Sequence, residues 1–124
     1  MNYEITGSIR SAGHCHCSIC RKSHGAAFAT WAQIDPDQFR WSSGPDLVEC
    51  YQSSPGHHRC FCKRCGSPLV ATQGGKVSEV VLATIDGDPQ VRPEAHIFVG
   101  SKAPWYEIAD PLPRFERWPP GLES

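Results

Sequence analysis

The chain has 124 residues, 40% of them hydrophobic and 20% charged, which is the composition of one globular domain with a modest core. Its 12 basic and 13 acidic residues leave a formal net charge of -1, so the chain lacks the strong positive field that binding along a nucleic-acid backbone requires. No apolar stretch is long enough to cross a membrane and no signal peptide opens the chain, so we expect a cytoplasmic protein.

Eleven glycines and eleven prolines predict short elements joined by many turns. In chain order we expect strands at residues 2–8, 26–34, 39–41, 47–53, 69–72, 77–85, 91–99 and 105–108. Residues 58–62 are expected to lead into a tight turn that carries Cys62 and Cys65. A loop rich in Cys and His is expected over 12–25, ending at Gly25. The strands at 69–72 and 77–85 flank Gly74 and Gly75, which predicts a hairpin.

Prolines are frequent from Pro104 onward, and a proline cannot donate a hydrogen bond to a sheet. We therefore expect residues 104–120 to wrap over the sheet rather than join it. No long stretch shows helical periodicity. The sequence thus predicts a mostly β fold in a single small domain that spans residues 1–124.

Six of the seven cysteines form two copies of the pattern Cys-x-Cys-x-x-Cys, namely Cys15, Cys17 and Cys20, and Cys60, Cys62 and Cys65. An odd number of cysteines in a chain without a signal peptide argues against a disulfide framework. The seventh, Cys50, lies in the middle of an expected strand and is most simply a small buried hydrophobic residue. Closely spaced thiolates are typical zinc ligands, so we expect bound metal.

The first triplet supplies three ligands, whereas a tetrahedral zinc ion takes four. An open fourth position would let a thiol bind, and the metal would lower its pKa so that the thiolate could add to the carbonyl carbon of an aldehyde. Two alternatives stay open at this point. One is a structural zinc closed by His14, His16 or His24, and the other is a triplet without metal.

Several motifs, in order and over nearly the whole chain, resemble those of one family. They are Cys-His-Cys-Ser-Ile-Cys-Arg-Lys at 15–22 with Gly25, Phe-Cys-Lys-Arg-Cys-Gly-Ser-Pro-Leu at 61–69, Ile85-Asp86, Pro93, His96-Ile97, Lys-Ala-Pro-Trp at 102–105, Asp-Pro-Leu-Pro at 110–113 and Phe115. The family is that of the glutathione-dependent formaldehyde-activating enzymes, which includes the centromere protein V domain. The resemblance implies a zinc-binding β-tent fold and a carbon–sulfur lyase that condenses glutathione with formaldehyde to S-hydroxymethylglutathione.

The second triplet departs from the family pattern. The resemblance implies that Cys62 and Cys65 bind a second, structural zinc together with an earlier Cys-x-Cys segment, which this sequence lacks before Asn2. Cys60 could provide a third ligand and His57 or His58 a fourth. The other interpretations are that this pair holds no metal, or that the protein starts upstream of Met1.

Two classes of function follow from these observations. The first is a zinc-dependent lyase whose partners are glutathione or a similar thiol and an aldehyde, with Arg21 and Lys22 as candidates for binding a substrate carboxylate. The second is a zinc-stabilised module that binds protein or nucleic acid without catalysis. A pocket beside the metal favours the first class, and a flat surface favours the second. Trp31 is expected in the core, or else as a pocket wall.

Overall fold

A computed structural model describes residues 1–121. In chain order the strands and the α-helix are β1 (Asn2–Ile5), β2 (Ser11–Cys15), α1 (Ser18–His24), β3 (Ala29–Gln33), β4 (Phe39–Ser43), β5 (Val48–Ser54), β6 (His57–Cys62), β7 (Pro68–Gln73), β8 (Lys76–Val81) and β9 (His96–Ile97). Short 3-10 turns lie at Pro36–Gln38, Pro45–Leu47, Leu82–Thr84 and Val99–Ser101.

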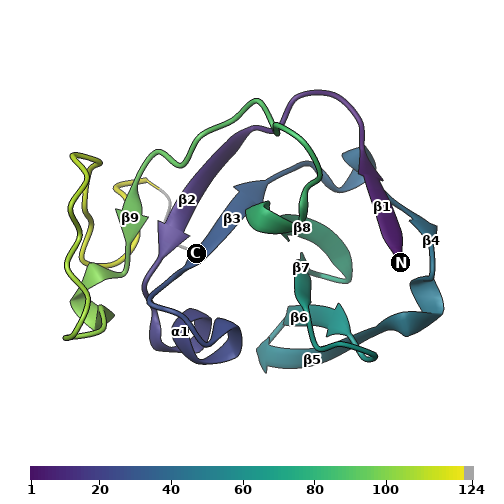
Figure 1. Cartoon of the computed structure of the whole chain (residues 1–124), viewed down its shortest axis with the longest axis horizontal. Coiled ribbons are helices and arrows are strands. Elements are labelled where there is room, and N and C mark those ends of the chain that lie inside the picture. The colour runs from purple at the N-terminus through teal and green to yellow at the C-terminus, as the bar shows by residue number, and fades with distance from the viewer. Residues whose placement is uncertain (122–124) are drawn as a thin grey trace.

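The strands form one large sheet and one small one (Figure 1). The seven-stranded sheet has the order β5-β6-β7-β8-β3-β2-β9, and β1 pairs only with β4. The pairs within the large sheet are antiparallel except for β2 with β9, which run parallel. The prediction of a mostly β fold is confirmed, and so is the hairpin at Gly74 and Gly75, which join β7 to β8 with positive φ at both residues.

One face of the large sheet packs against the small sheet. Its centre consists of buried side chains from three strands and the end of β3, namely Ile34, Cys60, Val70 and Val80. Partly buried aromatic side chains of β1 and β4 cover them, and Tyr3 stacks on Phe39 at a centroid distance of 5.2 Å. Alternation of side chains along each strand sends the neighbouring residues to the opposite face.

The opposite face carries the second cluster of buried residues, and this cluster contains sulfur. Ala29 and Trp31 of β3 and Val81 of β8 pack with Cys15 and Cys20. Helix α1 lies over this region (Figure 1). The first cysteine triplet is therefore part of the packed interior on this side of the sheet.

The expected loop over 12–25 is wrong, because the segment forms the end of β2 followed by helix α1. The helix has seven residues, too few to show helical periodicity in the sequence. The Cys17 sulfur caps its first turn by accepting from the backbone N–H of Cys20, and Gly25 ends it in the left-handed region at φ 58°.

The expected strands at 91–99 and 105–108 are also wrong. Regular pairing covers only His96–Ile97, because Pro93 cannot donate and Phe98 has φ 57°, outside the strand region. Residues after Pro104 run beside β9, where the His96 N–H donates to the Pro113 carbonyl oxygen and the Phe115 N–H donates to that of His96. Residues 122–124 of the predicted domain lie outside the described part of the chain. Within residues 1–121, no helix is both long and apolar enough to span a membrane.

Ile34 gives a direct test of the core between the two sheets, because its side chain is 2% exposed. We expect Ile34→Ala to lower the free energy of unfolding by about 2–5 kcal/mol through lost burial and a residual cavity. The matched control is Ile19→Ala, since Ile19 on α1 is 44% exposed. It should change the value by no more than about 0.5 kcal/mol. Chemical denaturation checks both variants, and equal losses would contradict this description of the core.

Candidate metal centre and adjoining pocket

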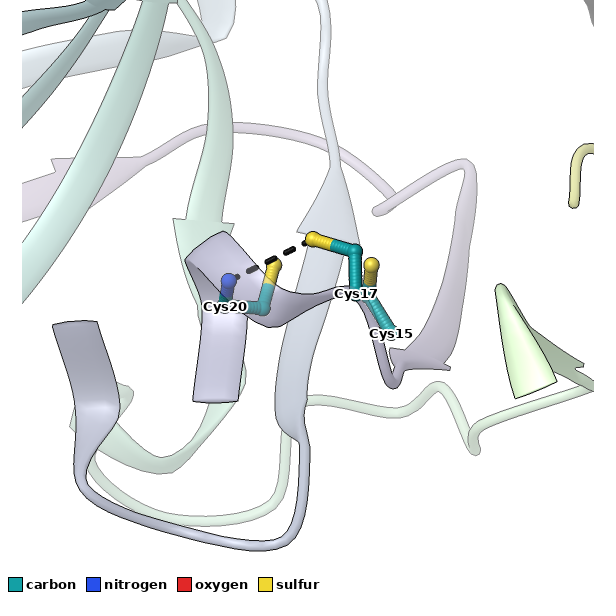
Figure 2. Close-up of side chains that lie close together, drawn as sticks. All are labelled: Cys15, Cys17 and Cys20. Atoms are coloured by element: carbon teal, nitrogen blue, oxygen red, sulfur yellow. Dashed lines mark hydrogen bonds between the residues drawn. The ribbon is translucent and has the colours of Figure 1, made fainter. Parts of the chain in front are cut away.

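Three sulfur atoms converge where β2 passes into helix α1 (Figure 2). Cys15 is the last residue of β2, Cys17 caps the helix, and Cys20 lies in its first turn. Their Sγ atoms all lie within 4.8 Å of one another. Cys15 and Cys20 are buried, whereas Cys17 is half-buried. A strand end and a helical turn thus bring together side chains that are close in the sequence.

The donor set fits a zinc ion. Three sulfurs at about 2.3 Å from a tetrahedral zinc lie about 3.8 Å apart, which agrees with the spacing of this group. Within residues 1–121 no other Cys, His, Asp or Glu joins the group. The described residues therefore offer three ligands, and the ring nitrogens of His14, His16 and His24 do not complete the set.

Hydrogen bonds within the group shift the pKa values of Cys15 and Cys17 in opposite directions. Hydrogen bonds with Cys17 and then Cys20, together with burial, raise the pKa of Cys15. Hydrogen bonds from Cys15 and Cys20 lower the pKa of Cys17, which is the acceptor of the group. A bound cation would take the place of these shared protons, since thiolates are the form that ligates metal.

A buried chain of hydrogen bonds fixes the residue between the first two cysteines. The His16 Nε2 lies 2.8 Å from the His96 Nδ1, and the His96 Nε2 lies 2.9 Å from the Asp110 carboxylate. Because a carboxylate only accepts, the His96 Nε2 carries a proton, and in a neutral His96 ring the Nδ1 then accepts from the His16 Nε2. Both residues have 0% exposure. The His16 ring thus lies in the interior and is not part of the sulfur group, and the hydrogen bonds join the cysteine triplet segment to the C-terminal segment.

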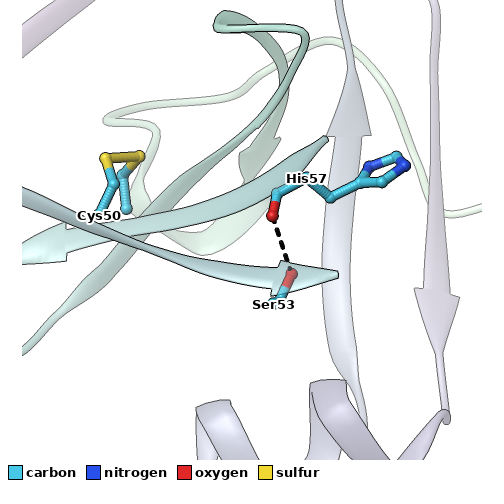
Figure 3. The surroundings of a disulfide bond; sticks show 4 residues. Cys50, Ser53 and His57 are labelled. Atoms are coloured by element: carbon cyan, nitrogen blue, oxygen red, sulfur yellow. Dashed lines mark hydrogen bonds between the residues drawn. A yellow bond between two sulfur atoms is a disulfide. The ribbon is translucent and has the colours of Figure 1, made fainter. Parts of the chain in front are cut away.

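The second cysteine triplet does not act as a unit. Cys60 forms a disulfide with Cys50, the residue opposite it in the antiparallel β5–β6 pair (Figure 3). The interpretation of Cys60 as a third metal ligand is therefore wrong, because its sulfur is already bonded. The expectation that Cys50 is a buried free thiol is wrong as well, since the residue is exposed. One disulfide is present where the sequence argued against any.

Cys62 and Cys65 lie on a tight turn at the end of β6. The Gly66 N–H donates to the Cys62 carbonyl oxygen at 2.7 Å, and Gly66 adopts φ 82°. A hydrogen bond with the Ser67 hydroxyl lowers the pKa of the exposed Cys65 thiol. Within the described chain this pair has no third Cys, His, Asp or Glu close enough to form a group. Its role as a second metal site stays a prediction.

Arg59 of β6 reaches the first triplet from across the sheet. Its Nη2 donates to the Cys20 Sγ at 3.3 Å and its Nη1 to the Ser23 hydroxyl at 3.1 Å. The guanidinium lies 5.5 Å from the centre of the Trp31 ring. Sequence reasoning missed this contact, because Arg59 and Cys20 are 39 residues apart.

A pocket of about 250 Å³ opens beside Arg59 and helix α1. Its walls include Ser23, His24, Trp31, Tyr51, Arg59 and Phe61. Trp31 is thus both a core residue and a pocket wall. A larger cavity of about 730 Å³ lies beside β1 and the 84–90 segment, but no Cys or His lines it. None of the three cysteines of the group lines the smaller pocket, which adjoins the group through Arg59 and helix α1.

The two basic residues proposed for substrate binding lie elsewhere on the helix. The Arg21 Nε donates to the Ser101 carbonyl oxygen at 3.1 Å, and Lys22 is exposed. Neither residue lines the pocket beside Arg59. Their binding of a substrate carboxylate stays a prediction.

Two comparisons of the sequence point to the same family. The sequence model of a family described as glutathione-dependent formaldehyde-activating enzyme matches residues 1–101. A Halomonas elongata protein that bears that name provisionally is 33% identical over 104 residues, which cover 76% of this chain and 65% of that protein. A crystal structure of a Rhodobacter sphaeroides protein matches with a TM-score of 0.53 at 24% identity, over 69% of this chain and 80% of that one. That last likeness concerns the fold alone.

Counting thiols tests the disulfide between Cys50 and Cys60. In denatured protein without reductant, we expect alkylation of the five free cysteines, and of all seven after reduction. In Cys50→Ser, all of the six cysteines that remain (seven less one) should react without reductant, because Cys60 loses its partner. Mass spectrometry gives the count. Alkylation of seven cysteines in the unreduced, denatured protein would contradict the disulfide.

Proposed function

Because this chain belongs to the family of glutathione-dependent formaldehyde-activating enzymes, we propose that it is a zinc-dependent carbon–sulfur lyase acting on a thiol and an aldehyde. Glutathione and formaldehyde are the proposed substrates, and S-hydroxymethylglutathione is the proposed adduct. The observation that carries the proposal is a set of three convergent thiols, one of which contacts Arg59 in the wall of a neighbouring pocket. We place the reaction in the cytoplasm, with no membrane partner.

Each residue of the first triplet has the same proposed role, which is to hold the metal as a thiolate. Zinc bound there would lower the pKa of an incoming thiol, so that the thiolate is available near neutral pH. Arg59 donates to the Cys20 sulfur and so spreads part of the negative charge of the three thiolates. The aromatic wall at Trp31 keeps water from one side of the group.

The proposed reaction balances without an oxidant or a reductant. In the forward direction the sulfur of the thiolate forms a bond to the carbonyl carbon of the aldehyde, and the carbonyl oxygen gains the proton that the thiol released. In reverse, the carbon–sulfur bond breaks, the sulfur keeps the electron pair, and the hydroxyl proton is lost as the carbonyl forms. Zinc is redox-inert, which suits this addition and elimination.

A zinc-stabilised binding module is the competing proposal, and the pocket argues against it. A closed structural site needs four protein ligands, and the described residues bring only three to this group. A module that binds a macromolecule would also need an exposed recognition surface beside the metal, whereas two of the three cysteines are buried.

Exchange kinetics test the proposed lyase. We expect zinc-loaded protein to accelerate the interconversion of S-hydroxymethylglutathione with formaldehyde and glutathione, measured by NMR exchange after subtraction of the spontaneous rate. Cys17→Ala removes one proposed metal ligand and should reduce the added rate by at least about 100-fold. Loss of a residue that only hydrogen-bonds a metal ligand typically reduces activity by about 10- to 100-fold, and loss of a ligand should cost more. Arg40→Met is the control, because Arg40 pairs with Glu4 on the small sheet. Wild-type protein that adds nothing to the spontaneous rate would refute the proposal.

A further inference from the structure

Arg59 carries a positive charge that is not matched by a carboxylate. Its side chain is half-buried, and its recorded hydrogen bonds go to a sulfur and a hydroxyl. Within residues 1–121 it forms no ion pair with Asp or Glu. The partly buried carboxyl group of Glu79 accepts instead from the Gln33 Nε2 at 2.6 Å. A partly desolvated guanidinium of this kind gains most from an anion that binds it directly.

The pocket that Arg59 lines is suited to an anion. No Asp or Glu is among its lining residues, and the nearby carboxyl group of Glu79, which interacts electrostatically with Arg59, lies outside the lining. The walls on either side are aromatic, with Trp31 beneath the guanidinium and Tyr51 opposite Arg59 in the β5–β6 pair. Arg59 and His24 are the basic side chains of the lining. Burial lowers the pKa of His24, which leaves the positive charge with Arg59.

The pocket adjoins the sulfur group through Arg59. Arg59 uses one N–H of Nη2 for Cys20 and one N–H of Nη1 for Ser23, so a carboxylate on its remaining N–H donors would bind about one guanidinium width from the candidate metal ligands. A ligand that bridges both positions needs a thiol and a carboxylate separated by a few bonds. Amino-acid and peptide thiols have that chemistry, as do short mercapto acids.

We propose that Arg59 and its pocket form the binding site for the carboxylate of the thiol substrate, so that the protein selects thiols that carry a carboxylate. This inference rests on the proposed function, which supplies the premise that a thiol substrate binds at the metal centre. It differs from the sequence-based expectation, which placed carboxylate binding at Arg21 and Lys22. The residue proposed to bind the carboxylate therefore lies on β6 rather than on helix α1.

Binding measurements on the zinc-loaded protein test the inference without turnover. Isothermal titration calorimetry would compare glutathione, 3-mercaptopropionate, 2-mercaptoethanol and S-methylglutathione. We expect Arg59→Met to raise the Kd of the three ligands that carry a carboxylate, namely glutathione, 3-mercaptopropionate and S-methylglutathione. The increase should be roughly 10- to 100-fold, because that is the loss typical of a hydrogen bond to a charged group. Binding of 2-mercaptoethanol should change by less than about twofold, since it has a thiol and no carboxylate.

Two further variants separate charge from structure. Arg59→Lys keeps the charge and loses the fork, so it should fall between wild type and Arg59→Met. Arg40→Met removes an exposed arginine of the small sheet and should bind as wild type does. Zinc content and circular dichroism identify variants that fail to fold. If Arg59→Met does not fold, the Kd values of Arg59→Lys are compared with those of the wild-type protein instead.

Each outcome decides the inference. Equal weakening of all four ligands would mean that Arg59 acts through the metal centre, and unchanged binding of S-methylglutathione would mean that it does not bind carboxylates. Either result overturns the inference. Failure of the lyase proposal looks different: the exchange rate stays at its spontaneous value while the dependence on Arg59 and on the carboxylate persists.

Discussion

The convergence of three thiols at the junction of β2 and α1 is the constraint on which the rest of the site depends. Cys15 ends β2, the strand next to the edge strand β9, and Cys20 lies one helical turn beyond the Cys17 cap, so backbone geometry alone brings the sulfurs together. The Cys17 sulfur accepts a hydrogen bond from the backbone N–H of Cys20. The backbone N–H groups in the first turn of a helix have no partner within the helix, so this bond satisfies one of them. The same sulfurs therefore start the helix and form the candidate metal centre.

Long-range contacts hold this junction from two sides. The hydrogen bonds from His16 to His96 and from His96 to Asp110 connect the junction to the C-terminal segment. His16 and His96 are 80 residues apart in the sequence. Arg59 connects it to the β5–β6 hairpin, where the Cys50–Cys60 disulfide lies next to Arg59 in the sequence. Rigid support of this kind matters to a ligand set, because a shift of the supporting residues changes metal affinity.

The features that could be predicted from the sequence are those formed by residues close together in the chain. The β7–β8 hairpin follows from Gly74 and Gly75, and the three cysteines of the candidate metal centre lie within six residues of sequence, so the hairpin and the convergence of the three sulfurs could both be predicted. The helix could not, since seven residues show no periodicity and its cap is a sulfur. Nor could the partner of Cys50, because the register of β5 against β6 includes a bulge near Gln52. Contacts of Arg59 and His96 depend on the folded topology.

X-ray absorption at the zinc edge tests the central claim most directly. The protein should carry Cys62→Ser and Cys65→Ser, so that zinc at one equivalent reports only on the first triplet. We predict three sulfur donors and one lighter donor, with a fourth sulfur after glutathione is added. A shell of four protein donors that glutathione leaves unchanged, or a protein that takes up no zinc, would contradict the account.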